Sequence, residues 1–372
     1  MRILYVLTSL GIGGAEKLAL ALGEQMARRG HTVALLVLMP PVPEQWPTHL
    51  EAIHLGITRS FFSRFSGILR ARRFAAAFRP DIIHSHSFHA NLIARVLWPF
   101  VPGAAVATVH NVYEGGTLRM FCYRITDGLS RRTVAVSEAA ARRFIHLKAI
   151  PAKKCAVIAN GIDTVKFAPD AARRARMRAD LGILENQFLW LAAGRIAPAK
   201  DYPNLLRAFT LVHAPDPDAH RPDARLWIAG EGIDADLAML GALARDLGIE
   251  KNIRWLGLRR DMPALLEAAD AFVSASAWEG MPLAVGEAMA MEKPVIATDV
   301  GGVRELVGGA GQLVPARDPQ ALSEAMCDLM QRSRKERRMR GGAARERIVR
   351  NFGMEAWFEK WEQLYQELHA RP

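Results

Sequence analysis

Short apolar runs alternate with stretches of helical periodicity along both halves of the chain, and this alternation restricts the possible folds more than any other feature. The first half contains RILYVLTSL, HTVALLVLM, PDIIHSHS, AAVATVH and TVAVSE, and the second contains FLWLAAG, ARLWIAG, IRWLG, AFVSAS and PVIATD. Apolar strands separated by helices predict parallel sheets covered on both faces. We therefore expect an α/β protein with two doubly wound, Rossmann-like domains that face a central cleft.

The boundary between the two series is predicted in the segment NGIDTVKFAP, residues 160–169, where Gly and Pro interrupt the pattern. A chain of 372 residues is long enough to bury two cores. We predict a first domain over residues 1–165 and a second over residues 166–352. Residues 353–372 carry apolar side chains at helical spacing, which predicts a helix that packs back on the first domain.

The apolar N-terminus is interpreted as a buried strand rather than a signal peptide, because a Gly-rich turn with Glu16 and Lys17 follows it. No apolar stretch is long enough to cross a bilayer. The three cysteines, Cys122, Cys155 and Cys327, are scattered and odd in number, which suits a reducing compartment. We therefore expect a cytoplasmic protein.

Positive charge is concentrated in the first half. Residues 1–168 hold 21 Lys and Arg against 9 Asp and Glu, a net charge of +12, whereas the rest of the chain holds 28 against 29, a net charge of −1. A segment of the first half, residues 61–79, places aromatic side chains beside basic ones: Phe61, Phe62 and Phe65 with Arg64, Arg70, Arg72 and Arg73. This pattern favours docking on an anionic membrane surface, although several of its apolar residues can instead pack on the sheet. Nucleic-acid binding is disfavoured because no recognition motif is present.

A glycine-rich turn follows the first strand, with Gly13 and Gly14 just before Glu16. Backbone N–H groups in such a turn can approach an anion at the helix N-terminus, but the turn can also be purely structural. The dinucleotide fingerprint requires Gly where Glu16 stands and an acid after the second strand, where Met39 stands. NAD binding is therefore disfavoured.

Two cations, Arg195 and Lys200, follow the strand FLWLAAG. Arg forms fork-like contacts with phosphate and Lys acts as a point charge, so the pair can clamp a diphosphate. Two cations on a loop are often simply solvated. Their position at a strand end favours function here, because ligands of such sheets bind beyond the carboxyl ends of the strands.

Two carboxylates follow the strand AFVSAS: Glu279 on a loop, and Glu287 inside the helix whose first turn suits Pro282. Free N–H groups at the helix start favour a phosphate between them, and carboxylates accept hydrogen bonds from neighbouring hydroxyls. A diphosphate that joins a ribose to a hexose is a nucleotide sugar. The alternative is a helix with ordinary surface acids.

No metal site is expected. The histidines near the third strand lack a Cys or carboxylate partner nearby in sequence: His84, His86 and His89. Two Asp-x-Asp pairs are present. We interpret Asp234 and Asp236 as acids in the first turn of a helix, and the pair in residues 216–218, Asp216 and Asp218, as part of a Pro-rich loop.

Taken in order, these motifs resemble those of the family 4 retaining glycosyltransferases with the GT-B fold, along nearly the whole chain. The matching segments are residues 13–16, 108–110, 136–138, 160–163, 194–195 with Lys200, 230–232, 279–287 and the stretch PVIATDVGGVREL. Gly286 and Ala159 depart from the usual pattern, in which a larger aliphatic residue and a Pro are common. We expect Gly286 to loosen the local packing.

The resemblance implies roles for individual residues. Glu287 would bind the donor ribose, and Glu279 the transferred sugar. The diphosphate would be held by Arg195 and Lys200 with help from the Gly13–Gly14 turn, and His110 would lie near the reacting carbon. The catalytic residues implied are His110, Arg195, Lys200 and Glu279. The other donor-binding residues implied are Glu231, Leu258, Arg259, Gly280, Met281 and Leu283, with backbone contacts to the base around Leu258 and Arg259.

The resemblance further implies a retaining hexosyltransferase that needs no metal or other cofactor. It would use a nucleoside-diphosphate sugar, UDP-linked, and a glycan or lipid-linked acceptor in cell-surface polysaccharide or glycolipid synthesis. The first domain would face the acceptor, the second would bind the nucleotide sugar, and the protein would be peripheral on the cytoplasmic membrane face. The alternative is a catalytically silent subunit that binds nucleotide sugars, which the intact donor-binding set disfavours.

Overall fold

The computed structural model describes residues 1–11, 13–40, 50–58, 60–213 and 223–370. The chain forms two compact units, one of Met1–Gly161 with Glu355–Pro372 and one of Ile162–Met354. The first boundary lies four residues before the one expected from the sequence, and the second lies two residues after it. The boundaries differ because Ile162 belongs to the second unit. It is buried, pairs with Gly353 in an isolated β-bridge, and donates its N–H to the carbonyl of Phe352 over 2.7 Å.

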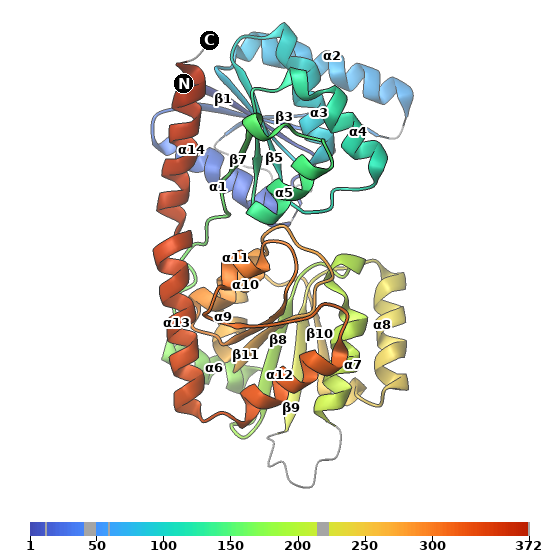
Figure 1. Ribbon diagram of the computed structural model, residues 1–372, viewed down its shortest axis with the longest axis vertical. Coiled ribbons are helices and arrows are strands. Elements are labelled where there is room, and N and C mark those ends of the chain that lie inside the picture. Colours follow the sequence, from blue (N-terminus) through green and yellow to red (C-terminus); the bar gives the residue numbers. More distant parts are fainter. Residues whose placement is uncertain (12, 41–49, 59, 214–222, 371–372) are drawn as a thin grey trace. The chain divides into compact units, whose positions relative to one another are not determined.

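The described part of the first unit contains seven strands and most of the helices of the first half, followed by the last helix of the chain (Figure 1). In chain order its described elements are β1 (Arg2–Leu7), α1 (Gly14–Arg28), β2 (Thr32–Val37), β3 (Glu51–His54), α2 (Phe61–Phe78), β4 (Ile82–His86), α3 (Phe88–Leu97), η2 (Trp98–Phe100), β5 (Ala104–Val109), α4 (Thr117–Ile125), η3 (Asp127–Leu129), β6 (Arg132–Ala135), α5 (Glu138–His146), η4 (Ala152–Lys154), β7 (Cys155–Val157) and α14 (Met354–His369).

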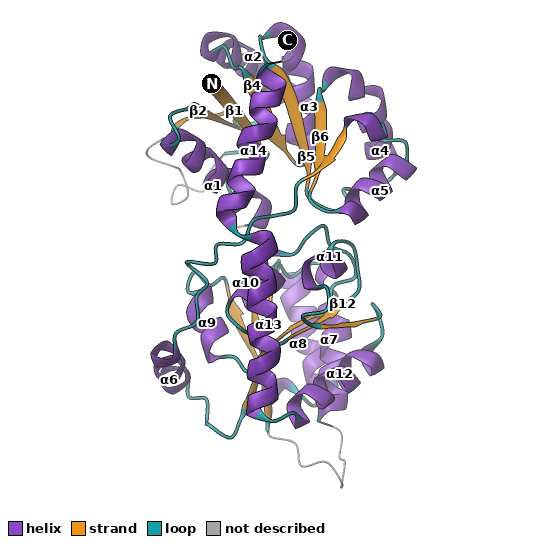
Figure 2. Ribbon diagram, turned by 60° about the vertical axis from the view of Figure 1, so that its left-hand side comes forward, coloured by secondary structure: helices purple, strands orange, loops and turns teal. Residues whose placement is uncertain are grey.

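The strands of the first unit form a parallel sheet in the order β3-β2-β1-β4-β5-β6-β7. Successive side chains of a strand point to opposite faces, so β1 contributes to two different cores. Leu4 and Val6 pack with apolar residues of α2 and α3. Tyr5 points to the other face, where its hydroxyl lies 3.1 Å from that of Tyr365 in α14. Helices therefore cover both faces of this sheet, as the alternating pattern predicts (Figure 2).

The second unit repeats this arrangement with a six-stranded parallel sheet in the order β10-β9-β8-β11-β12-β13. Its described elements are α6 (Ala171–Asp180), β8 (Phe188–Ala193), η5 (Pro198–Lys200), α7 (Tyr202–Val212), β9 (Ala224–Ala229), α8 (Asp234–Asp246), η6 (Glu250–Asn252), β10 (Ile253–Gly257), α9 (Met262–Ala268), β11 (Ala271–Ser274), α10 (Leu283–Ala290), β12 (Val295–Thr298), α11 (Val303–Val307), β13 (Gln312–Val314), α12 (Pro319–Gln331) and α13 (Arg334–Phe352).

A large apolar cluster of the second unit lies between its sheet and the helices α7, α8 and α12. Trp190 of β8 and Phe209 of α7 are fully buried in this cluster. On the α6 side, Arg174 and Arg178 reach Asp270, which directly precedes β11, with nitrogen–oxygen distances of 2.7 and 3.1 Å. These contacts fix the sheet whose carboxyl edge carries the residues discussed below.

Three strands were not predicted from the sequence: β3, β7 and β13. Each has three or four residues and lies at an edge of its sheet. Edge strands can be short and half-exposed, so they lack the long apolar run that identifies a buried strand. Among the described residues, none of the helices has the length and apolar character needed to cross a membrane.

Candidate functional site

The loops that follow five neighbouring strands of the second sheet are tied to one another at its carboxyl edge. The ties are backbone hydrogen bonds of 2.6–2.9 Å from Gly194 to Ala229, Ile196 to Glu231, Gly230 to Gly257, Ala277 to Ala199 and Gly302 to Gly280. Because parallel strands end at the same edge, the loops after β8, β9, β10, β11 and β12 lie side by side. The structure thus brings most of the predicted donor-binding residues to one rim of the second unit.

Gly230 lies where this rim is tightest. A Cβ added there would stand 1.9 Å from the carbonyl oxygen of Gly194, a separation that real Cβ atoms do not show. Only glycine allows the loops after β8 and β9 to approach this closely. Close packing between the two loops therefore explains the glycine at position 230 in the Gly-Glu-Gly stretch, residues 230–232. The side chain of Glu231 is exposed at the rim.

Lys200, Glu279 and Ser276 form a polar cluster at this rim. The Lys200 ammonium forms an ion pair with Oε1 of Glu279, and Oγ of Ser276 donates to the same oxygen over 2.7 Å. Glu279 and Ser276 are buried, and Oγ1 of Thr298 donates to the Ser276 carbonyl over 2.6 Å. The carboxylate is thus held in one orientation through its Oε1.

The two predicted diphosphate cations differ in their surroundings. Lys200 is half-buried against Glu279, whereas Arg195 is exposed and contacts no acid among the described residues. The sequence motif did not indicate that Lys200 and Glu279 are partners, because 79 residues separate them. It also did not indicate Ser276, whose only sequence signal is its place between the end of β11 and Glu279.

Glu287 lies in the second turn of α10 and is half-buried. The helix begins at Leu283, so Pro282 is its N-cap rather than a residue of its first turn, which corrects the sequence expectation. The expectation for Gly286 was also wrong. A Cβ at Gly286 would stand 2.6 Å from Cδ1 of Ile162, so the Ile162 side chain fills the space and the packing is not loosened.

The remaining predicted donor residues occupy two loops of the same rim. Gly280 and Met281 are buried between β11 and α10, and Leu283 begins α10 half-buried. Leu258 and Arg259 directly follow β10 and are also half-buried. Arg259 forms a fork-like pair with Asp261 at 2.9 and 2.6 Å, and these hydrogen bonds lower the pKa of Asp261. This pair fixes the loop for which the family resemblance implies backbone contacts to the nucleoside base.

His110 belongs to the first unit, directly after β5. Its Nε2 lies 3.0 Å from Nδ1 of His86, the last residue of β4. Burial lowers the pKa of His110 to about 4, so its imidazole is neutral at pH 7. Its backbone N–H donates to Glu114 over 2.9 Å, and the Tyr123 hydroxyl donates to the other Glu114 oxygen over 2.7 Å. Burial raises the pKa of Glu114 to about 6.

The glycine-rich turn of the first unit leads directly into α1. Gly13 is the N-cap in an extended conformation, and Gly14 is the first helical residue. Sequence reasoning missed His86 and Glu114 as neighbours of His110. His86 was considered only as a metal ligand, and Glu114 had no signal beyond its position four residues after His110.

The Asp-x-Asp pairs and the histidines, which were considered as metal ligands, do not form a metal site in the described part of the chain. Asp234 and Asp236 stand in the first turn of α8, as the sequence predicts, and residues 216–218 lie outside the described residues. His84 is hydrogen-bonded to Tyr365 and Thr108, at 2.6 and 2.7 Å. Within the described part of the chain, no group of three or more His, Cys, Asp or Glu side chains could hold a metal ion.

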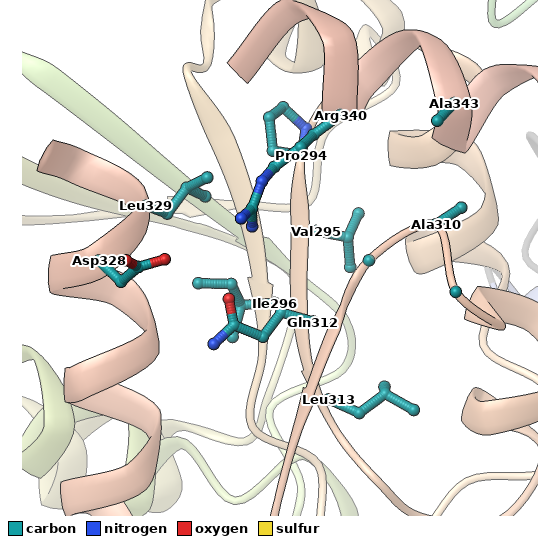
Figure 3. Close-up of a pocket in the computed structure, with 12 residues that line it drawn as sticks. Pro294, Val295, Ile296, Ala310, Gln312, Leu313, Asp328, Leu329, Arg340 and Ala343 are labelled. Atoms are coloured by element: carbon teal, nitrogen blue, oxygen red, sulfur yellow. The ribbon is translucent and has the colours of Figure 1, made fainter. Parts of the chain in front are cut away.

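A cavity of about 670 Å³ lies elsewhere on the second unit (Figure 3). It is lined by residues at the starts of β12 and β13 and by α12 and α13, among them Pro294, Gln312, Asp328 and Arg340. In a parallel sheet the strand starts lie at the edge opposite the strand ends. The cavity therefore contains none of the predicted site residues.

Comparison with known proteins agrees with this geometry. Two family models match the chain: Glycosyltransferase Family 4 over residues 12–166, and Glycosyl transferases group 1 over residues 187–332. A D-inositol 3-phosphate glycosyltransferase of Corynebacterium glutamicum (strain R) is 30% identical over 310 residues, which cover 78% of this chain and 73% of the relative. The UDP-Gal:alpha-D-GlcNAc-diphosphoundecaprenol alpha-1,3-galactosyltransferase of Escherichia coli is 28% identical over 297 residues, covering 77% and 75%.

Comparison with solved structures gives a glycosyltransferase fold as well. HepE of Anabaena, solved in complex with UDP-glucose, superposes with a TM-score of 0.86 at 21% identity, covering 99% of this chain and 100% of that one. The two parallel α/β sheets thus have the GT-B arrangement, and the family models and relatives above are glycosyltransferases. The chain belongs to the family 4 glycosyltransferases with the GT-B fold.

Proposed function

We propose that this protein is a retaining, metal-independent hexosyltransferase. It moves a hexose from a UDP-linked sugar to a glycan or lipid-linked acceptor in cell-surface polysaccharide or glycolipid synthesis. The observation that carries the proposal is the cluster of Lys200, Glu279 and Ser276 at the same rim as Arg195 and Glu287. Cations for a diphosphate and fixed carboxylates for hydroxyls are the groups that a nucleotide sugar requires.

In this proposal, Lys200 serves two partners. An ammonium group has three donors, so Lys200 can keep Glu279 in place and still donate to a phosphate oxygen. Arg195 adds an exposed guanidinium to the same loop. Together they stabilise the negative charge that develops on the departing diphosphate. Oε2 of Glu279, the oxygen to which Lys200 and Ser276 do not donate, accepts a hydrogen bond from the transferred sugar, and Glu287 binds the ribose.

Transfer with retention is proposed to occur on one face of the sugar. The bond from the anomeric carbon to the diphosphate oxygen breaks, and the bond to the acceptor oxygen forms on the same face. The acceptor proton passes to the leaving diphosphate, so no enzyme base is required. Retention rests on the family resemblance, and the cations supply the charge that a divalent metal would otherwise bring.

Two comparisons support the choice of donor and acceptor. HepE was solved with UDP-glucose, and the name of the E. coli relative states a UDP-galactose donor and an alpha-D-GlcNAc-diphosphoundecaprenol acceptor. These properties belong to those proteins. For this chain, the first donors to test are therefore UDP-sugars, and the first acceptors are sugars linked to a lipid diphosphate.

The proposed function is tested by a thermal-shift screen of nucleotide sugars followed by a transfer assay. The expected result is stabilisation by one UDP-sugar and transfer that persists in excess EDTA, with the product in the anomeric configuration of the donor. Loss of activity in EDTA with rescue by magnesium or manganese would contradict metal independence. Binding without transfer to any acceptor would indicate a catalytically silent subunit.

Replacing Glu287 by alanine is expected to weaken donor binding by about 1.5–3 kcal/mol, because a hydroxyl loses its charge-assisted acceptor. Calorimetric titration with the donor measures the change. Glu250→Ala is the matched control, since this exposed glutamate lies before the start of β10, at the opposite edge of the sheet. An unchanged affinity in Glu287→Ala would remove Glu287 from the site.

The proposal includes docking of the first unit on an anionic membrane. The helices α2, α3 and α4 contain no acidic residue, and α2 exposes 82% of Phe62 and 58% of Phe65. On α4, Leu118, Phe121 and Ile125 are 74, 55 and 62% exposed at helical spacing. Exposed apolar side chains on helices with basic residues favour the interface of an anionic bilayer. The side chains of Phe61 and Arg64, which the sequence analysis included in this pattern, are outside the part of the chain that the structure describes.

Sedimentation with vesicles tests this docking. The protein is expected to bind phosphatidylglycerol vesicles at low salt, less at moderate salt, and phosphatidylcholine vesicles hardly at all. Phe62→Ser with Phe65→Ser should lower binding while donor affinity stays intact. Leu184→Ser with Ile233→Ser removes two comparably exposed apolar side chains of the second unit and serves as the control. Equal binding to both kinds of vesicle would refute the proposal.

A further inference from the structure

Three histidines of the first unit lie in contact on one face of its sheet. His84 and His86 alternate on β4 with ring centroids 4.1 Å apart, and the His86 and His110 rings are 5.2 Å apart and nearly parallel. His86 is 4% exposed, and its Nδ1 lies 3.0 Å from Nε2 of His110. Its other ring nitrogen, Nε2, is buried and has no hydrogen-bond partner among the described residues.

The charge state limits how the two rings can share this hydrogen bond. Burial lowers the pKa of both His86 and His110, so both rings are neutral at pH 7 and each carries one N–H. One of the two facing nitrogens must donate. If His110 donates from Nε2, the proton of His86 stands on Nε2, where it is a buried donor without a partner. If His86 donates from Nδ1, the partnerless atom is only a lone pair.

The second arrangement is favoured, because buried N–H groups without an acceptor are rarer in proteins than acceptors without a donor. We propose that His86 is a positioning residue: its Nδ1–H donates to Nε2 of His110 and holds His110 as the tautomer with the proton on Nδ1. His110 then presents a neutral N–H donor at Nδ1, rather than a base.

The surrounding contacts hold this arrangement rigidly. The His110 main chain is fixed by the hydrogen bond from its N–H to Glu114. His84 cannot replace His86, because its two ring nitrogens are engaged by Tyr365 and Thr108. The consequence for catalysis rests on the proposed function and on the family resemblance, which implies that His110 lies near the reacting carbon. There, an N–H donor would stabilise an oxygen of the donor sugar in the transition state.

Two variants of His86 separate its hydrogen bond from its packing. In His86→Asn the amide nitrogen occupies the place of Nδ1 and can still donate to His110. In His86→Leu the bulk is kept but the donor is lost. His84→Leu is the control for damage to the buried cluster, since His84 is also fully buried but forms no hydrogen bond with His110 in the structure.

The first measurement is the tautomer of His110, from two-bond ¹H–¹⁵N correlation spectra of the full chain without donor. The Nδ1–H form is expected in the wild type, in His86→Asn and in His84→Leu, and a shift toward the Nε2–H form in His86→Leu. An Nε2–H tautomer of His110 in the wild type would overturn the proposal. So would an unchanged tautomer in His86→Leu.

The second measurement is the kinetics of transfer. His86→Leu is expected to lower kcat about tenfold or more with little change in KM, and His86→Asn to restore most of the loss. Equal losses in the two variants would show that His86 acts only through packing. If no donor supports transfer, the proposed function fails, while the tautomer measurement still decides the role of His86 by itself.

Discussion

Replacing Lys200 by alanine should lower the turnover of glycosyl transfer about 10²–10³-fold, the size of effect found when one preorganised donor to a developing negative charge is lost. The structure adds a second consequence. Lys200 is the ion-pair partner of the buried Glu279 carboxylate, which would keep the Ser276 hydroxyl as a donor but lose its cation. Stability is therefore expected to fall by about 1–3 kcal/mol.

The two consequences can be separated with two further variants. Arg195→Ala should lower turnover without loss of stability, because Arg195 is exposed and contacts no acid among the residues described. Lys200→Ala combined with Glu279→Gln should recover stability, because the unpaired charge is gone, but not turnover. Steady-state kinetics and thermal unfolding measure both. Wild-type turnover in Lys200→Ala would show that Lys200 only holds Glu279.

Replacing Gly341 by alanine should destabilise the second unit by about 1–3 kcal/mol, although alanine favours helices more than glycine does. Gly341 lies in α13, where this helix packs against the turn after α10. A Cβ there would stand 2.0 Å from the carbonyl oxygen of Glu292 and 2.7 Å from its carbonyl carbon. The clash is with backbone, so α13 would have to move away from the turn.

The neighbouring Gly342 provides the matched control. It lies in the same helix, and a Cβ there would meet no atom within 4 Å. Gly342→Ala is therefore expected to stabilise the protein by about 0.5–1 kcal/mol through helix propensity alone. Calorimetry should show unfolding midpoints that move in opposite directions, by about 2–4 °C per kcal/mol. Midpoints that move together would contradict the predicted clash.

The central strands could be predicted from the sequence because each is buried on both faces and appears as an apolar run, as in RILYVL of β1 and FLWLAA of β8. The edge strands could not. β3 and β7 have only four and three residues and contain no fully buried residue, so they are too short to be told from a loop by pattern, and only pairing with a neighbour identifies them.

The candidate site was likewise predictable from the sequence only in part. Arg195, Lys200, Glu279 and Glu287 could be named from the sequence because each follows a recognisable strand, and the ends of parallel strands meet at one edge. Their pairing could not be predicted. The ion pair between Lys200 and Glu279 depends on β8 and β11 being neighbours in the sheet, although β9 and β10 lie between them in the chain.

The sequence by itself determined the class of fold, the family and the loops that carry the chemistry, because periodicity and motifs are local properties of the chain. Only the tertiary structure decided which groups touch. It placed Ile162 in the space beside Gly286, Ser276 and Lys200 on one oxygen of Glu279, and His86 against His110. These contacts join residues from different strands and loops, and their distances depend on strand order and packing, which no local pattern encodes.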